Sequence, residues 1–168
     1  LRTIGKAVLA DLEQGTGPIC HRNSGQQVLN WITPRLLNRD ALVQVVPGPL
    51  NGALRLPGQM YLLGNDLLAS TTGPEAAAGH LIAAEIAQDE QQVTQQALEY
   101  AGAFASLRLM TLGTLPRNAL AGYGEKLLDQ PLLRPDADAL PAAFADHDLS
   151  TEPYARSLDP TGASVLSL

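Results

Sequence analysis

The residues best suited to chemistry lie in an alanine-rich segment at positions 75–87. The segment contains His80, and a helical histidine binds zinc when a glutamate follows it directly and a second histidine stands four positions on. In that pattern both imidazoles face one metal ion and the glutamate activates a water. Here Leu81 takes the place of the glutamate and Ala84 that of the second histidine. The segment therefore predicts a zinc-site helix that has lost its hydrolytic chemistry.

The helical neighbours of His80 support this interpretation. Side chains three, four and seven positions away share its face, and these positions hold Gly73, Ala76, Ala77, Ala83, Ala84 and Ala87. None of them binds a metal or transfers a proton. Glu75 and Glu85 stand about 140 degrees around the helix from His80 and point elsewhere. We therefore expect His80 to be packed or hydrogen-bonded in a vestigial cleft.

An upstream segment gives this helix a context. Residues 51–63 contain Leu56-Pro57-Gly58. They resemble the N-A-F-A-L-P-G-G strand segment of the gluzincin metallopeptidases, the group that includes the CAAX prenyl proteases, HtpX, Oma and BepA. Asn51 is one residue out of register with that segment.

A downstream pair of motifs extends the resemblance. Ala145-Asp146 and Asp159-Pro160 start fourteen positions apart. The family's E-x-x-A-D helix and its later Gly-Tyr-Asp-Pro turn are similarly separated. On this register the family's third zinc ligand, a glutamate, falls on Ala142.

The resemblance covers the chain from about residue 40 onwards and implies both a fold and a site. The implied fold is α+β, a mostly α-helical zincin-like domain with a small β-sheet, and residues 1–168 form this single domain. The implied vestigial site consists of His80, Leu81, Ala84, Ala142 and Asp146. Because Leu81, Ala84 and Ala142 replace the essential residues of a zinc metalloendopeptidase, we expect no catalytic residue, no bound metal and no cofactor; zinc belongs to the ancestral family.

The function that follows is an inactive, metallopeptidase-like module that binds a peptide or a protein. Folds of this kind bind a peptide as an added strand along a sheet edge, where main-chain hydrogen bonds supply affinity without catalytic groups. The candidate edge strand is Met60, Tyr61, Leu62 and Leu63. The resemblance favours the periplasm or cell envelope over the cytoplasm, in a role such as protein quality control.

Two alternatives stay open. In the first, the chain is a zinc-dependent metallopeptidase with a non-standard site, formed by His80, His147 and either Asp146 or Asp148. In the second, it is a structural or regulatory module whose old cleft is filled by side chains and binds nothing.

Composition limits the partners. The chain has 168 residues, 45% of them hydrophobic, which is enough for a core. Its formal net charge of −6 argues against nucleic acid and disfavours anionic lipid headgroups. No apolar run is long enough to span a bilayer. Cys20, the only cysteine, forms no internal disulfide, and we interpret it with His21 as a loop pair without a catalytic role.

Periodicity predicts the elements that position the site. Apolar residues four apart indicate a first helix through Ile4, Val8 and Leu12. A second helix is expected around residues 28–37, and strands at 41–46 and 60–63. Thr72 is the expected N-cap of the histidine helix, which should run to about Asp89. Helices at 90–112 and 116–128, a loop at 130–141 and further helices complete the expectation.

Overall fold

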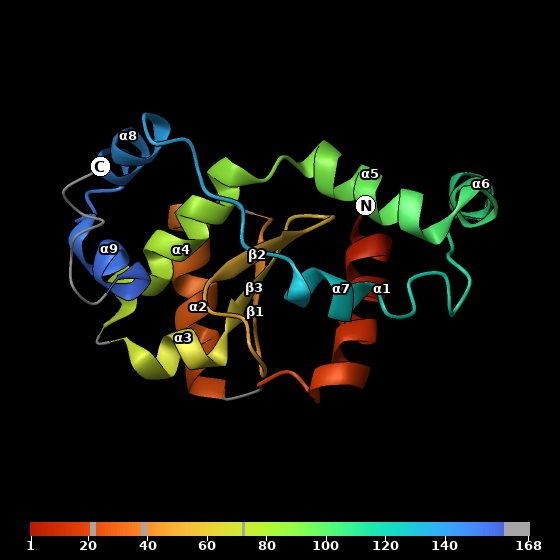
Figure 1. The fold of residues 1–168 in the computed structure, drawn as a ribbon, viewed down its shortest axis with the longest axis horizontal. Helices are drawn as coiled ribbons and strands as arrows, with labels where there is room; N and C mark the ends of the chain where they lie inside the picture. The colour runs from red at the N-terminus through yellow and green to blue at the C-terminus, as the bar shows by residue number, and fades with distance from the viewer. Residues whose placement is uncertain (21–22, 38–39, 72, 160–168) are drawn as a thin grey trace.

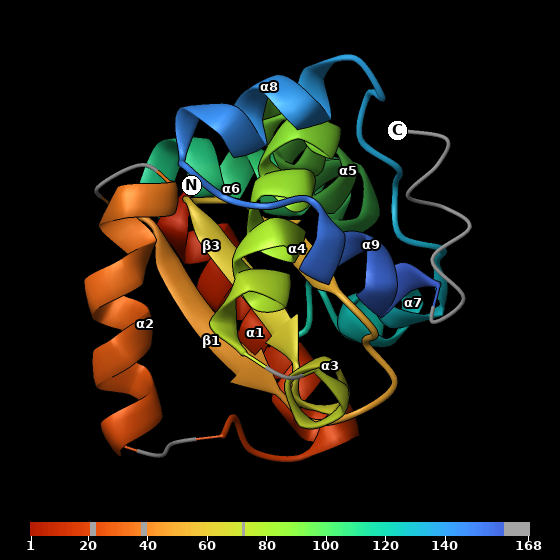
Figure 2. The same ribbon diagram turned by 90° about the vertical axis from the view of Figure 1, so that its left-hand side faces the viewer.

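The computed structural model describes residues 1–20, 23–37, 40–71 and 73–159. In this part of the chain a three-stranded mixed sheet is enclosed by helices (Figures 1 and 2). The strands are β1 (Leu42–Val46), β2 (Ala53–Leu56) and β3 (Met60–Gly64). The helices are α1 (Arg2–Thr16), α2 (Asn23–Leu36), α3 (Asn65–Ser70), α4 (Pro74–Ala87), α5 (Glu90–Ala101), α6 (Ala103–Leu112), α7 (Tyr123–Asp129), α8 (Ala139–Asp146) and α9 (Glu152–Leu158). The expected α+β, mostly helical class is confirmed.

The sheet has the order β1-β3-β2. Strand β1 runs parallel to β3, and β2 runs antiparallel to it with Leu56 opposite Met60. A tight turn joins β2 to β3, and its Gly58 has a φ of 87°. A Cβ atom at this position would lie 2.5 Å from the Cα of Arg2, so the turn requires glycine both for its conformation and for the close approach of the N-terminal chain.

The prediction that β3 is an edge strand is wrong. Met60, Tyr61, Leu62 and Leu63 pair with β1 on one side and β2 on the other, and all four are buried. An unbroken apolar run is typical of a strand that is covered on both faces. Here that run marks the centre of the sheet, and the edges fall to β1 and β2.

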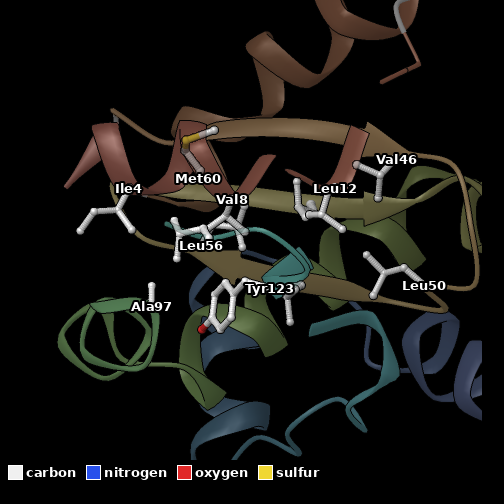
Figure 3. Packing of buried hydrophobic residues seen from close by; sticks show 12 residues of the cluster. Ile4, Val8, Leu12, Val46, Leu50, Leu56, Met60, Ala97 and Tyr123 are labelled. Atoms are coloured by element: carbon white, nitrogen blue, oxygen red, sulfur yellow. The ribbon is translucent and has the colours of Figure 1, made fainter. Parts of the chain in front are cut away.

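One face of the sheet packs against α1. Met60 and Leu62 of β3 point to this side, where they join Ile4, Val8 and Leu12 of α1 in one cluster (Figure 3). The expected first helix is therefore confirmed, and its four-residue apolar spacing is the seam that contacts the sheet. Helix α7 completes this layer through Tyr123.

The opposite face packs against α4 and α2 (Figure 2). Tyr61 and Leu63 alternate with their neighbours in β3 and point to this side, as side chains of a strand must. There they meet Leu81 and Ala84 of α4. Helix α4 is thus held directly on the sheet.

Helix α4 is buried around its whole circumference. Every residue from Ala76 to Ala84 is buried, because α8 and α9 pack on the side of α4 that faces away from the sheet. At Gly79 a Cβ atom would lie 2.7 Å from Tyr154 and 2.9 Å from Phe144. The alanine and glycine content of the segment is therefore a packing requirement, since a helix that is apolar on all sides belongs in a core.

Other predictions are confirmed in part. The expected helix at 90–112 is two helices, since Gly102 with a φ of 86° separates α5 from α6. The expected helix at 116–128 consists of turns followed by α7. The expected cap Thr72 lies outside the described residues, and the N-cap of α4 is Gly73. Among the described helices, none is both long and apolar enough to cross a bilayer.

Replacing a central residue of β3 should test this architecture. Leu62→Ala is expected to lower the free energy of unfolding by about 3 kcal/mol, because Leu62 is 0% exposed and its truncation leaves a cavity. The control is Leu42→Ala in β1, where 36% exposure predicts a loss of about 1 kcal/mol or less. Urea denaturation followed by circular dichroism measures both. Equal losses would contradict the central position of β3.

Candidate functional site

The site is built around His80, which α4 carries toward α9. The side chain is 4% exposed, and its Nε2 lies 2.8 Å from the Oγ of Ser157. The Ser157 hydroxyl donates its proton to the carbonyl oxygen of Tyr154, one turn back in α9. With that proton committed, the hydroxyl accepts a hydrogen bond from Nε2–H, which fixes the tautomer of the imidazole. The ring of Tyr154 stacks edge-on against His80 with centroids 4.8 Å apart.

Burial sets the charge of this histidine. Loss of hydration lowers the pKa of His80 from 6.5 to about 4, because the charged imidazolium is disfavoured in the interior. The imidazole is therefore neutral at physiological pH. In the described part of the chain its hydrogen-bond partner is Ser157, and no carboxylate orients it as in a Ser-His-Asp triad.

A cavity of about 450 Å³ opens beside His80. Helix α4 lines it with His80, Ala84 and Gln88, and β2 contributes Ala53. The extended segment between α7 and α8 forms the opposite wall, with Leu132, Leu133, Arg134, Pro135 and Ala137 facing the cavity. The volume lies within the range of small-ligand pockets, and the walls are largely apolar.

The outer edge of β2 borders this cavity. The N–H of Arg55 points away from β3, because it donates to the Oε1 of Gln88 at 2.6 Å. Backbone groups alternate along an antiparallel strand. The N–H and C=O of Ala53 and the C=O of Arg55 therefore also point away from β3. Of these outward groups, those of Ala53 border the cavity, whereas Arg55 lies outside its lining and its N–H is already paired with Gln88.

The opposite edge of the sheet is occupied. Cys20 donates its backbone N–H to the carbonyl of Val45 at 2.9 Å, and the side chain of Gln26 donates to the carbonyl of Val43 at 3.2 Å. Two outward carbonyls of β1 thus already have donors. His21, the neighbour of Cys20 in the sequence, lies outside the described residues.

The predicted vestigial residues are only partly brought together. Ala84 lines the cavity with His80, whereas Leu81 packs toward the sheet with Tyr61. Ala142 and Asp146 lie on the exposed side of α8. The register that placed a zinc-ligand position at Ala142 is therefore wrong in this structure.

Helix α8 turns a different face toward α4. Its buried residues are Leu140 and Phe144, which contact Ile82 and Ala83 of α4. Ala142 is two residues from each of them in the sequence, so it lies on the opposite face of α8. The side chains beside His80 come instead from α9.

The alternative metal site is not assembled either. His147 ends α8, and Asp146 and Asp148 beside it are exposed. Across the described ranges, no three His, Cys, Asp or Glu side chains are grouped so that they could hold a metal ion. His80 is instead engaged with Ser157.

A buried polar cluster beyond the cleft was not predicted. Arg55 is 7% exposed, and its Nη1 lies 2.8 Å from both Glu85 Oε2 and the carbonyl oxygen of Gln88. Its Nε lies 3.4 Å from Glu90 Oε2, and Tyr61 donates its hydroxyl proton to Glu85. Burial, reinforced by Glu85, raises the pKa of Tyr61 far above its ordinary value. The cluster ties β2 to the end of α4 and the start of α5.

One sequence signal could have located this cluster. Arg55 is the only charged residue between Ala53 and Leu63, and a buried cation requires a partner. Glu85 lies near the end of α4, and Glu90 is the first residue of α5. The sequence therefore indicates that Arg55 needs an acidic partner, but it does not indicate that the partners are Glu85 and Glu90.

No protein-family model matches the chain, and no curated protein matches it in sequence. The relation to gluzincin metallopeptidases is therefore a proposal that rests on the quoted motifs.

The burial of His80 predicts a pH dependence of stability. Between pH 6.5 and pH 4 the unfolded chain takes up a proton on His80 that the folded chain does not, so stability falls as the pH falls through this window. The expected slope approaches about 1.4 kcal/mol per pH unit, and His80→Gln should remove it. Urea titrations at several pH values measure the slope. An NMR titration midpoint of the His80 ring near pH 6.5 would contradict the buried, neutral imidazole.

Proposed function

We propose that this chain is a peptide-binding module of metallopeptidase-like architecture that hydrolyses no peptide bond. Its binding site is the cavity beside His80, with α4 and Ala53 of β2 on one side and the segment before α8 on the other. The observation that carries the proposal is the cavity of about 450 Å³ beside His80, which β2 borders at Ala53.

The geometry of the edge suits an extended peptide. A chain that enters the cavity beside Ala53 forms main-chain hydrogen bonds with the outward N–H and C=O of that residue. Alternate side chains of the added strand then point toward α4. There the cavity offers Ala83, Ala84 and Leu140, which favour an apolar side chain. The occupant is therefore a peptide in extended conformation with apolar residues at every second position.

The chemistry of the cleft supports binding rather than hydrolysis. The groups that would activate a water in a zinc peptidase are replaced by Leu81 and Ala84, and His80 is bonded to Ser157. The Ser157 proton is directed to a backbone carbonyl, so the pair is not arranged for attack on a peptide bond. Neutral His80 contributes a polar wall.

The cavity also favours binding over the competing structural role. A module whose old cleft is only a remnant would fill it with side chains, since voids cost stability. Here small residues of α4 face the cavity, and the segment opposite leaves it open. The proposal includes a location in the periplasm or cell envelope, which the motif resemblance favours over the cytoplasm.

Filling the cavity should weaken peptide binding. Ala137 is exposed and lines the cavity, so Ala137→Trp places an indole there without disturbing the core. Extended peptides selected from a displayed library of linear peptides serve as the probe. For such a peptide, fluorescence polarisation should show affinity reduced about tenfold or more, equivalent to about 1.4 kcal/mol.

The matched control is Ala145→Trp. Ala145 is exposed on α8 and does not line the cavity, so peptide affinity should stay unchanged. Both variants should melt within a few degrees of the parent. If no peptide is enriched over an unrelated protein, or if both tryptophans weaken binding equally, the proposed cleft is not the binding site.

A further inference from the structure

Helix α6 presents an apolar surface to solvent. Phe104 is 74% exposed, Leu107 61%, Met110 85% and Leu112 67%. Exposed apolar side chains are ordinary when scattered. Here four large ones occupy a single helix of ten residues.

Three of these side chains, those of Phe104, Leu107 and Met110, form the outward side of α6, and Leu112 is exposed at its C-terminal end. Ala105 is buried, and Leu109 packs against the core cluster next to it. At about 100 degrees per residue, Phe104, Leu107 and Met110 span roughly 120 degrees on the side away from this contact. A surface helix normally turns its polar side to water. Helix α6 turns an apolar side outward.

The charge around α6 differs from that of the rest of the chain. From Tyr100 to Gly124 the sequence has no aspartate or glutamate, and it contains Arg108 and Arg117. Both arginines are exposed. The whole chain carries 17 acidic residues and a net charge of −6, so this stretch reverses the sign along the sequence, and the acidic residues near α6 are Glu90 and Glu99 of α5, on the side of Ala103 and Ser106.

The position of α6 leaves this surface accessible. Gly102, with a φ of 86°, ends α5 and sets α6 off at an angle. Figure 1 shows α6 at one end of the long axis of the molecule, whereas α8 and α9 lie at the other. The exposed side of α6 is therefore remote from the cleft beside His80.

We propose that the α6 tip, defined as Phe104, Leu107, Arg108, Met110 and Leu112, inserts into the surface of a bilayer that contains anionic phospholipids. Its apolar side chains enter the boundary between headgroups and acyl chains. The two guanidinium groups of Arg108 and Arg117 pair with lipid phosphates, as basic residues next to an inserted helix do. The average charge of the chain predicts no such attraction, but the local distribution supplies it.

A second copy of the chain fits this surface less well. A stable interface buries about 800 Å² on each partner, and one face of the ten-residue helix provides three large apolar side chains toward it. Two such tips would also bring two pairs of arginines together without an acidic residue of the stretch between them. Binding to a lipid surface requires no large interface of complementary shape, and lipid phosphates supply the negative charges that the arginines need.

Vesicle flotation tests the proposal directly. The purified chain should float with vesicles of phosphatidylcholine and phosphatidylglycerol, and less with phosphatidylcholine alone. The double variant Phe104→Ser/Met110→Ser should bind the mixed vesicles about tenfold more weakly. Arg108→Gln/Arg117→Gln should lose about tenfold on the mixed vesicles and little on phosphatidylcholine.

A matched control uses α2. Val28→Ser/Trp31→Ser removes two apolar side chains that are 52% and 62% exposed, and vesicle binding should be unchanged. Insertion itself is read from Phe104→Trp in a Trp31→Phe background, whose emission should shift to the blue on mixed vesicles while native Trp31 does not. Circular dichroism verifies that each variant is folded.

Three results would overturn the proposal. They are no flotation of the folded parent, equal losses in the α6 and α2 double variants, and a dimer in sedimentation equilibrium that Phe104→Ser disperses. The last result would assign the surface to a second copy.

Discussion

The enclosure of helix α4 is the constraint on which the rest of the structure depends. The sheet lies against one side of α4, and α8 and α9 lie against the other, so the helix has no solvent-facing stripe between Ala76 and Ala84. Only small side chains allow partners to approach from several directions at once, and at Gly79 even a Cβ atom would collide with Tyr154 and Phe144. In the sequence, the alanines of α4 suggest that metal-binding residues have been lost. In the structure, these small side chains allow the sheet, α8 and α9 to pack against one helix.

Enclosure also dictates how polar groups near α4 are satisfied. His80 cannot carry a charge at this depth, and it is accommodated as a neutral ring bonded to Ser157. Arg55 cannot lose its charge, and it is accommodated by Glu85 and Glu90 where α4 ends and α5 begins. The pairing of Arg55 also affects the position of β2, because the backbone N–H of Arg55 donates a hydrogen bond to the side chain of Gln88 in the same region. The polar cluster therefore fixes the edge of β2 against the end of α4, and with it the side of the cavity that these two elements form.

Local patterns in the sequence predicted elements better than partners. The seam of Ile4, Val8 and Leu12 predicted α1, because that helix is amphipathic and contacts a single layer. The run in β3 predicted a strand but not its place, since pairing at both edges is a property of the whole sheet. The register at Ala142 failed because motif matching ignored size: Leu140 and Phe144 are the large side chains of α8, and they determine which face is buried. The pairing of Arg55 and the apolar exposure of α6 both depend on distant contacts, which no short window of sequence contains.

The two proposed surfaces are compatible because charge and position separate them. The α6 tip lies at one end of the long axis, and the cleft lies between β2, α4 and the segment before α8 (Figure 1). Since the stretch around α6 contributes two positive charges to a net charge of −6, the remainder of the molecule is more acidic still. An anionic bilayer attracts the tip and repels that remainder, so the chain stands on its α6 end with α8 and α9 directed away from the lipid. In this orientation the cavity beside His80 faces water, where an extended peptide can reach it.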